Sequence, residues 1–526
     1  MQRQLTFLRR SEDEEIKQAG ITLDFDEIAR RGVMSKEEKS VAKWYGIYGS
    51  RQPGNHMARV VVPGGVVTSS QARNIAKVAE DFAQGRLNIT TRQSIQFHWL
   101  KVGNVANVMR ELAKEGTSTK HGCGDVTRNT AACPLATTCE YRRMNVLPYA
   151  QKTAKFLTDA DDLENLPRKF KVTFSGCAGG CAQPYMNCVG NVAVAREVQG
   201  KTEAGFKVII GGGMGWKAFV GKELFSFVPA DRIHLLNRAV ALLFRDHGDR
   251  FNRAKARLKF VVHRFGIDKC RELILDLLQE EGVSTEGFLT DSFEDIGPAI
   301  PDRPLTVENP VGTDGKVTVR AMVPKGELSH LQFRSLAELS DVFGNQKLIT
   351  TNRQNVELPG IEPKNRDEVI GEIQKIGFST SGFHGIKDIV PCVGSTYCPK
   401  AVSTTRELHD LLTGIVGKTK YESIEKKVMI NITGCPNSCS PYRIVDIGFR
   451  GMWIREEMGS VEGYEMLIGG HEQNHGLKLG DFKRDDCPTI TEKVLDHFVE
   501  VRTGEETLTD TVRRVGIKSF SEAILE

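Results

Sequence analysis

The stretches LNITTRQSIQFHWL (residues 87–100) and KLITTNRQNVELPG (residues 347–360) decide the fold, because they are two versions of one pattern. Each contains Ile-Thr-Thr followed by Arg-Gln, and the shared motifs centre on Arg92 and Arg353. Residues 94–99 alternate polar and apolar side chains, which predicts a strand with one polar and one apolar face. An internal repeat of this kind indicates that the chain is built from two related units.

The elements around the two stretches repeat as well. Helical spacing of apolar residues predicts a helix before and a helix after each stretch, at residues 72–85, 104–116, 331–344 and 366–377. The chain is therefore predicted to be an internally duplicated α+β protein. We expect the halves to pack about a pseudo-two-fold axis, with a site between them.

Each half also carries C-x5-C followed by C-x3-C. The four positions are Cys133, Cys139, Cys177 and Cys181 in the first half, and Cys392, Cys398, Cys435 and Cys439 in the second. Four thiolates from two short motifs suit a soft metal centre, either zinc or iron–sulfur. Structural zinc sites usually have tighter C-x2-4-C knuckles, so the spacing favours iron–sulfur.

Several motifs resemble one enzyme family. The cysteine segments 391–401 and 431–451 resemble the cluster-binding pair of the sirohaem- and [4Fe–4S]-dependent nitrite and sulfite reductases. TTRQSIQFHW (90–99), GCGDVTRN (122–129) and LPRKFK (166–171) are similar to that family's sirohaem and substrate motifs, and they stand in the family's order. The chain is identified as a member of this family, most like a sulfite reductase haemoprotein.

The resemblance implies a domain plan of two ferredoxin-like subdomains and two sirohaem- and cluster-binding α/β subdomains. The predicted divisions are an N-terminal extension that wraps or crosses the surface (1–50), a ferredoxin-like half-domain (51–118), a sirohaem- and substrate-binding domain (119–305), a second ferredoxin-like half-domain (306–382), and a cluster- and sirohaem-binding domain with a helical C-terminal region (383–526).

The resemblance also implies the roles of individual residues. Cys392, Cys398, Cys435 and Cys439 would hold a [4Fe–4S] cluster, and Cys439 would bridge it to the sirohaem iron. The catalytic positions are Arg92, Arg128, Lys169 and Lys171, and the further cofactor contacts are Gln96, His98 and Arg353. Lys169 and Lys171 flank Phe170, so on a strand both cations would point to one side. A satisfied, hydrogen-bonded histidine is an equally good interpretation of His98.

The first-half quartet departs from the family pattern, and three interpretations stay open: free thiols left by duplication, a second [4Fe–4S] cluster, or a second sirohaem–cluster pair. In the second half, Lys427 takes the place of Lys169, Met429 that of Lys171, and Lys387 faces Arg128. This anion pocket has lost one cation and one guanidinium, so we expect one catalytic sirohaem.

The expected function is six-electron reduction of sulfite to sulfide. Lys169-Phe170-Lys171 favours sulfite, because plant-type nitrite reductases of the family tend to have Lys-x-Asn there. The alternatives are nitrite reduction to ammonia by the same centre and, from another class, a non-catalytic tetrapyrrole or electron-transfer protein. No flavin or nicotinamide motif is apparent, so a separate ferredoxin or flavoprotein is expected to supply electrons.

The composition agrees with a cytoplasmic enzyme. A net charge of +4 over 526 residues argues against a dedicated nucleic-acid binder. No apolar run has the length of a membrane span, and the N-terminus lacks the apolar stretch of a signal peptide. We therefore expect no nucleic-acid or membrane partner.

Overall fold

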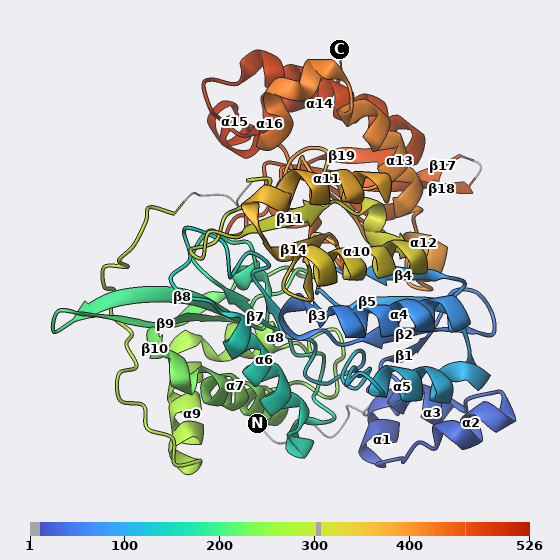
Figure 1. The fold of residues 1–526 in the computed structure, drawn as a ribbon, viewed down its shortest axis with the longest axis vertical. Helices are drawn as coiled ribbons and strands as arrows, with labels where there is room; N and C mark the ends of the chain where they lie inside the picture. The colour runs from blue at the N-terminus through green and yellow to red at the C-terminus, as the bar shows by residue number, and fades with distance from the viewer. Residues whose placement is uncertain (1–10, 301–306, 458, 526) are drawn as a thin grey trace.

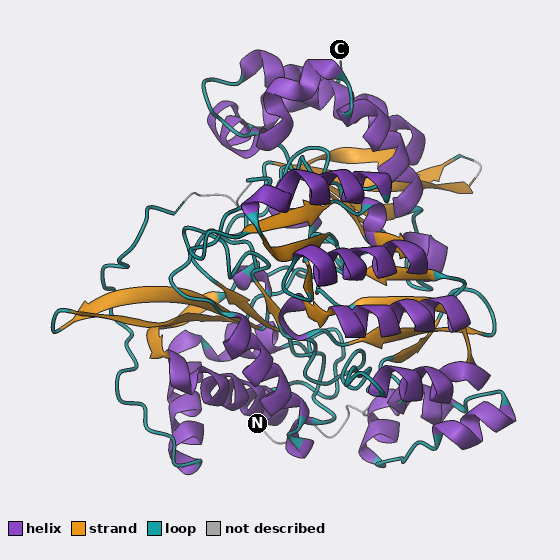
Figure 2. Ribbon diagram, in the orientation of Figure 1, coloured by secondary structure: helices purple, strands orange, loops and turns teal. Residues whose placement is uncertain are grey.

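The computed structural model describes residues 11–300, 307–457 and 459–525. The predicted domain boundary at 305/306 and the two chain ends lie outside these ranges. Figure 1 shows the first half of the chain, blue to green, below the second half, yellow to red. Helices and strands alternate in layers through the molecule (Figure 2), as the predicted α+β class requires.

Two sheets form the centre of the molecule, and each includes one strand from the other half of the chain. The first has the order β1-β2-β5-β4-β12 and the second β11-β14-β13-β3. The strands are β1 (Ile47–Gly49), β2 (Asn55–Val60), β3 (Val66–Thr68), β4 (Arg86–Ile89), β5 (Ile95–Lys101), β11 (Val317–Ala321), β12 (Glu327–Ser329), β13 (Lys347–Thr350) and β14 (Val356–Ile361). Because β12 pairs with β4 and β3 pairs with β13, the exchange ties the halves together about the pseudo-two-fold axis.

The same signals start the main helices of the two halves. Thr68 and Ser329 are N-caps of reciprocal capping boxes with Gln71 and Gln332, which satisfy backbone N–H groups at the helix starts. The helices of this layer are α4 (Ser69–Phe82), α5 (Val105–Ala113), α10 (His330–Phe343) and α11 (Arg366–Lys375). Helices α4 and α10 pack against each other, and their apolar faces share one core with the two central sheets.

Two larger sheets carry the cysteine motifs and have identical topology. Their orders are β10-β9-β8-β7-β6 and β15-β16-β17-β18-β19, with three parallel strands followed by two antiparallel ones. The strands are β6 (Ala131–Ala132), β7 (Val172–Ser175), β8 (Val189–Val198), β9 (Lys201–Ile210), β10 (Lys222–Pro229), β15 (Val390–Pro391), β16 (Ile430–Thr433), β17 (Ile447–Glu456), β18 (Gly459–Ile468) and β19 (Leu477–Lys483).

Helices cover both larger sheets. Beside the first sheet lie α6 (Leu147–Thr158), α7 (Ile233–His247), α8 (Leu258–Phe265) and α9 (Ile267–Glu280). With the second are α12 (Gly394–Tyr397), α13 (Thr405–Val416), α14 (Cys487–Val501), α15 (Leu508–Val515) and α16 (Ile517–Ala523). Among the described residues no helix is both long and apolar enough to cross a bilayer.

The N-terminal extension forms part of the interior. It folds into α1 (Glu12–Gln18), α2 (Phe25–Arg31) and α3 (Lys36–Val41). Lys17 is 3% exposed and forms a salt bridge of 3.1 Å between its Nζ and Asp125 Oδ2. Arg168 and Arg253 bind the same carboxylate. The buried ion pair anchors α1 to the first half, and residues of this segment line one side of the cavity described below.

Strand β5 has the predicted polar and apolar faces, and both faces are buried. Its polar residues Gln96 and His98 are as buried as its apolar ones. Trp99 has φ of +66°, and the pairing of β5 with β2 shifts register next to it, so the alternation ends before Leu100. The polar face is buried because it faces an internal cavity.

Candidate active site

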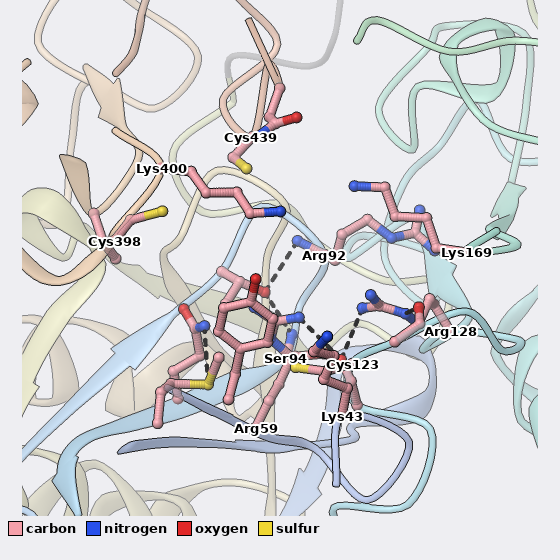
Figure 3. A pocket seen from close by; sticks show the side chains of 18 of the residues that line it. Lys43, Arg59, Arg92, Ser94, Cys123, Arg128, Lys169, Cys398, Lys400 and Cys439 are labelled. Carbon is pink, nitrogen blue, oxygen red and sulfur yellow. Dashed lines mark hydrogen bonds between the residues drawn. The ribbon is translucent and has the colours of Figure 1, made fainter. Parts of the chain in front are cut away.

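A cavity of about 320 Å³ lies between the two halves, and its wall has a sulfur side and a cationic side. Figure 3 shows Cys398 and Cys439 facing Arg92, Arg128 and Lys169 across it. All four second-half cysteines line the cavity, and so do the four predicted catalytic cations: Cys392, Cys398, Cys435 and Cys439, with Arg92, Arg128, Lys169 and Lys171. Segments some three hundred residues apart thus meet in one site.

Backbone amides hold the sulfur side in position. Cys392 follows β15 directly, and its N–H donates to Ile432 O at 2.8 Å. Its Sγ accepts hydrogen bonds from the N–H groups of Gly434, at 3.2 Å, and Gly394, at 3.4 Å. Such donors stabilise negative charge on sulfur, as a cluster ligand requires.

Cys439 is the exposed member of this quartet. Its sulfur points into the cavity in Figure 3. The hydroxyl of Thr91, in the first repeat motif, donates to Cys439 O at 2.6 Å. The loop that carries Arg92 therefore also positions the fourth cysteine of the other half.

Lys169 and Lys171 lie side by side on the cationic side. Between them Phe170 is fully buried, and its residue forms a parallel bridge to Thr127, so the segment is extended as predicted. Burial and then the nearby Arg257 guanidinium lower the pKa of Lys169 to about 7. Burial and then Lys169 place the pKa of Lys171 well below its ordinary value. Burial and the neighbouring cations both disfavour the charged ammonium groups, and a bound anion would offset both effects.

The two arginines are held by neutral acceptors. Arg92 donates to Asn187 Oδ1 at 2.9 Å and to the carbonyls of Asn129 and Val172. Arg128 donates to the carbonyls of Gly124 and Gly122, each at 2.9 Å. Burial lowers the pKa of both guanidinium groups to about 10, so both remain charged at neutral pH.

Gln96 and His98 also line the cavity. Gln96 Nε2 donates to Met57 Sδ at 3.4 Å. The His98 ring stacks on Tyr397 with centroids 4.0 Å apart, and burial together with Arg406 and Arg59 lowers its pKa to about 3. His98 is therefore neutral, and both of its ring nitrogens are buried without a hydrogen-bond partner in the described structure, which argues against the interpretation as a satisfied, hydrogen-bonded histidine.

The structure places Arg353 elsewhere. It is not among the residues lining the cavity, and its Nε donates to Asp388 Oδ2 at 2.5 Å. Both side chains are buried. The family resemblance implied that Arg353 contacts the cofactor, but the ion pair with Asp388 already engages its guanidinium, which argues against that contact. Its neighbour Gln354 reaches the cavity wall instead.

Sequence reasoning missed several lining residues. Lys43, Arg59, Cys123 and Lys400 all line the cavity and are labelled in Figure 3. Lys43 comes from the N-terminal extension, where no repeat or motif points to it. Lys400 follows Cys398 by two residues, and this closeness to a predicted cluster ligand is the signal that could have placed it in the cavity wall.

The first-half quartet lies away from this cavity. Cys133, Cys139, Cys177 and Cys181 are buried, and none of them lines the cavity. Within the described ranges, no three His, Cys, Asp or Glu side chains are arranged as ligands of a single metal ion, and this holds for both quartets.

Comparisons with known proteins agree with this arrangement. The family described as "Nitrite and sulphite reductase 4Fe-4S domain" matches residues 123–281 and 383–526. The "Nitrite/Sulfite reductase ferredoxin-like half domain" matches residues 48–115 and 311–376. This chain belongs to the nitrite and sulfite reductase family.

Individual relatives span almost the whole chain. An assimilatory ferredoxin-dependent nitrite reductase of Haloferax mediterranei is 28% identical over 95% of this chain and 90% of its own. A sulfite reductase [ferredoxin] of Mycolicibacterium paratuberculosis is also 28% identical, over 93% and 92%. The structure of the Mycobacterium tuberculosis NirA protein has a TM-score of 0.88 at 26% identity and covers 97% of this chain and 98% of that one.

Membership confirms the predicted family, duplicated fold and enzyme class, and it gives the cofactors as a sirohaem and a [4Fe–4S] cluster. The cavity fits these groups. Arg59 Nε, Arg92 Nε and both ring nitrogens of His98 are buried without a hydrogen-bond partner in the described structure. A polyanionic macrocycle between the cations and the thiols would supply acceptors and compensating charge.

Proposed function

We propose that this enzyme reduces sulfite to sulfide by six electrons, in preference to nitrite. The observation that carries the proposal is the second cation, Lys171, beside Lys169 in the cavity wall. Sulfite can carry two negative charges, and two adjacent ammonium groups match that charge better than one does. The relatives named above include both sulfite and nitrite reductases at equal identity, so the choice rests on the pocket.

We propose the following division of labour. Cys392, Cys398, Cys435 and Cys439 would hold the [4Fe–4S] cluster, and Cys439 would be the thiolate that couples it to the sirohaem. When bound, this pair of cofactors supplies electrons one at a time to the substrate. The thiolates fix its position, and the amides of Gly394 and Gly434 stabilise the charge on Cys392.

The two arginines bind the substrate, and the two lysines supply protons to it. Arg92 and Arg128 are held rigidly by carbonyl acceptors, so they present their remaining N–H donors to an oxyanion with little loss of entropy. Lys169, with a pKa of about 7, exchanges a proton readily at neutral pH. The sulfite oxygens must leave as water, and Lys169 and Lys171 are the groups placed to deliver those protons.

The substrate preference is tested with Lys171→Asn. We expect kcat/KM for sulfite to fall about a hundredfold, while kcat/KM for nitrite changes much less, because one cation binding the second negative charge is lost. Lys427→Asn is the control, since Lys427 is the second-half equivalent of the neighbouring Lys169 and forms an ion pair with Glu505 outside the cavity wall. An unchanged ratio of the two kcat/KM values in Lys171→Asn would overturn the preference for sulfite.

We further propose that a reduced ferredoxin donates the electrons and that the enzyme works in the cytoplasm. Both curated relatives named above are ferredoxin enzymes. All twelve cysteines are free of disulfides, which suits a reducing compartment. Turnover with reduced ferredoxin but not with NADPH is the expected result, and turnover with NADPH alone would contradict the proposed donor.

A further inference from the structure

We propose that Cys133, Cys139, Cys177 and Cys181 bind a second [4Fe–4S] cluster that carries no sirohaem. The proposed reduction needs only the cluster on the second-half quartet, so this site goes beyond it. The argument rests on the geometry of the four thiols and on their correspondence with the second quartet.

The four thiols converge in the interior. Their residues are between 4% and 9% exposed, and none forms a disulfide. Cys133, Cys139 and Cys181 belong to one buried cluster. Cys133 and Cys177 follow β6 and β7, which are paired neighbours in the sheet. Four buried thiols gathered at the ends of neighbouring strands form a set of soft ligands.

The backbone places the first cysteine of both quartets identically. Cys133 follows β6 and donates its N–H to Phe174 O at 2.8 Å. Cys392 follows β15 and donates its N–H to Ile432 O, also at 2.8 Å. Cys177 and Cys435 each stand two residues beyond the end of the next parallel strand.

The fourth cysteines are tied across the pseudo-two-fold axis in the same way. Asn352 Nδ2, in the second repeat motif, donates to Cys181 O at 2.6 Å. Thr91 Oγ1, in the first, donates to Cys439 O at 2.6 Å. Each repeat motif therefore positions the last ligand of the other half's quartet.

The surroundings of Cys181 leave no place for a macrocycle. Glu472 approaches so closely that its Oε2 lies 2.5 Å from where a Cβ on Gly180 would be. Its Oε1 accepts from Tyr185 N at 2.9 Å. Arg353, the residue after Asn352 in the second repeat motif, is engaged by Asp388 and is not available to a second anionic macrocycle. Cys439 lines the cavity, whereas Glu472 packs beside Cys181, so the second cluster has no haem.

The deciding measurement is iron and acid-labile sulfide per chain in the anaerobically purified holoenzyme, scaled to its sirohaem. We expect about nine irons and eight sulfides per sirohaem, from two [4Fe–4S] clusters and one haem iron. About five irons and four sulfides would overturn the second cluster. Zinc bound in place of the additional iron, or two disulfides found by mass spectrometry of the unreduced chain, would overturn it equally.

The double variant Cys139→Ser and Cys177→Ser assigns the iron to this quartet. We expect a loss of about four irons and four sulfides with the sirohaem absorption retained. Cys487→Ser is the matched control, because Cys487 is buried outside both quartets and donates only to Lys483 O. If the double variant does not fold, Mössbauer spectra of the reduced wild type decide the question. One cluster coupled to haem and one uncoupled cluster support the proposal, and a single coupled cluster rejects it.

Sirohaem retention separates this proposal from the proposed function. Loss of the sirohaem-coupled cluster in the double variant, with the other iron intact, would mean that the quartets had been assigned the wrong way round. Failure of the second cluster alone leaves sulfite reduction at the cavity unaffected.

Discussion

The two halves have the same backbone fold but differ in the partners of their cationic side chains. In the first half Arg92 and Arg128 donate to neutral carbonyls, and Lys169 lies among other cations. In the second half the corresponding groups are neutralised, Arg353 by Asp388, Lys387 by Glu425 and Lys427 by Glu505. The cations of the first half are therefore available to bind an anion, whereas the corresponding cations of the second half form ion pairs within the protein.

The difference shows how duplication divides a function. Burying a cation without an anion costs free energy, and the binding of an anionic ligand offsets that cost. The second half supplies sulfur to the shared cavity and the first half supplies charge, so neither half forms the site alone. Four predictions test this division.

The largest effect is expected for the fourth cysteines. Cys439→Ser should abolish turnover and uncouple the haem from its cluster, because this thiolate is the proposed bridge. Cys181→Ser, its counterpart, should leave the sirohaem absorption unchanged. Optical and EPR spectra of both variants provide the check, and a Cys439→Ser protein with wild-type spectra would reject the bridge.

Arg353→Ala should destabilise the protein strongly. Removing the guanidinium leaves Asp388 as a buried carboxylate without its cation. In the wild type, burial raises the pKa of Asp388, but Arg353 and its other neighbours lower it by more, so it lies below its ordinary value. We expect the free energy of unfolding to fall by about 3–5 kcal/mol, measured by denaturant titration. A loss below about 1 kcal/mol would show that the pair contributes no more than a surface ion pair does.

Arg92→Gln should show the opposite profile. Its hydrogen bonds to neutral acceptors contribute less to stability, whereas its proposed contact with the oxyanion is lost. We expect kcat/KM for sulfite to fall about a hundredfold to a thousandfold, with near wild-type unfolding in the same titration. Activity within a factor of a few of wild type would remove Arg92 from the proposed anion site.

The smallest effect is expected for a change of one pH unit. Lys169 has a pKa of about 7 in the folded chain against 10.5 as the ordinary value, so between these limits the unfolded chain binds more protons. The stability of the cofactor-free chain should therefore rise with pH in this window, by up to about 1.4 kcal/mol per pH unit from this group. Lys169→Met removes the contribution, and parallel stability curves for the two proteins would contradict it.

The sequence by itself determined the family, the duplication and the chemistry of the ligands. The repeat motifs, the two cysteine spacings and Lys169-Phe170-Lys171 are local patterns, and local patterns fix strands, turns and the direction in which side chains point. The structure places the four predicted cluster ligands and the four predicted cations around one cavity, although their roles there stay predictions.

Only the tertiary structure decided which of the repeated residues can share a site. Arg92 and Arg353 look equivalent in the sequence, but Asp388 approaches only one of them. Glu472 packs against Gly180 beside Cys181, and helix α1 and the turn after α3 bring Lys17 and Lys43 to the cavity. These contacts join residues far apart in the chain, and burial makes the cost of an unpaired charge depend on such neighbours.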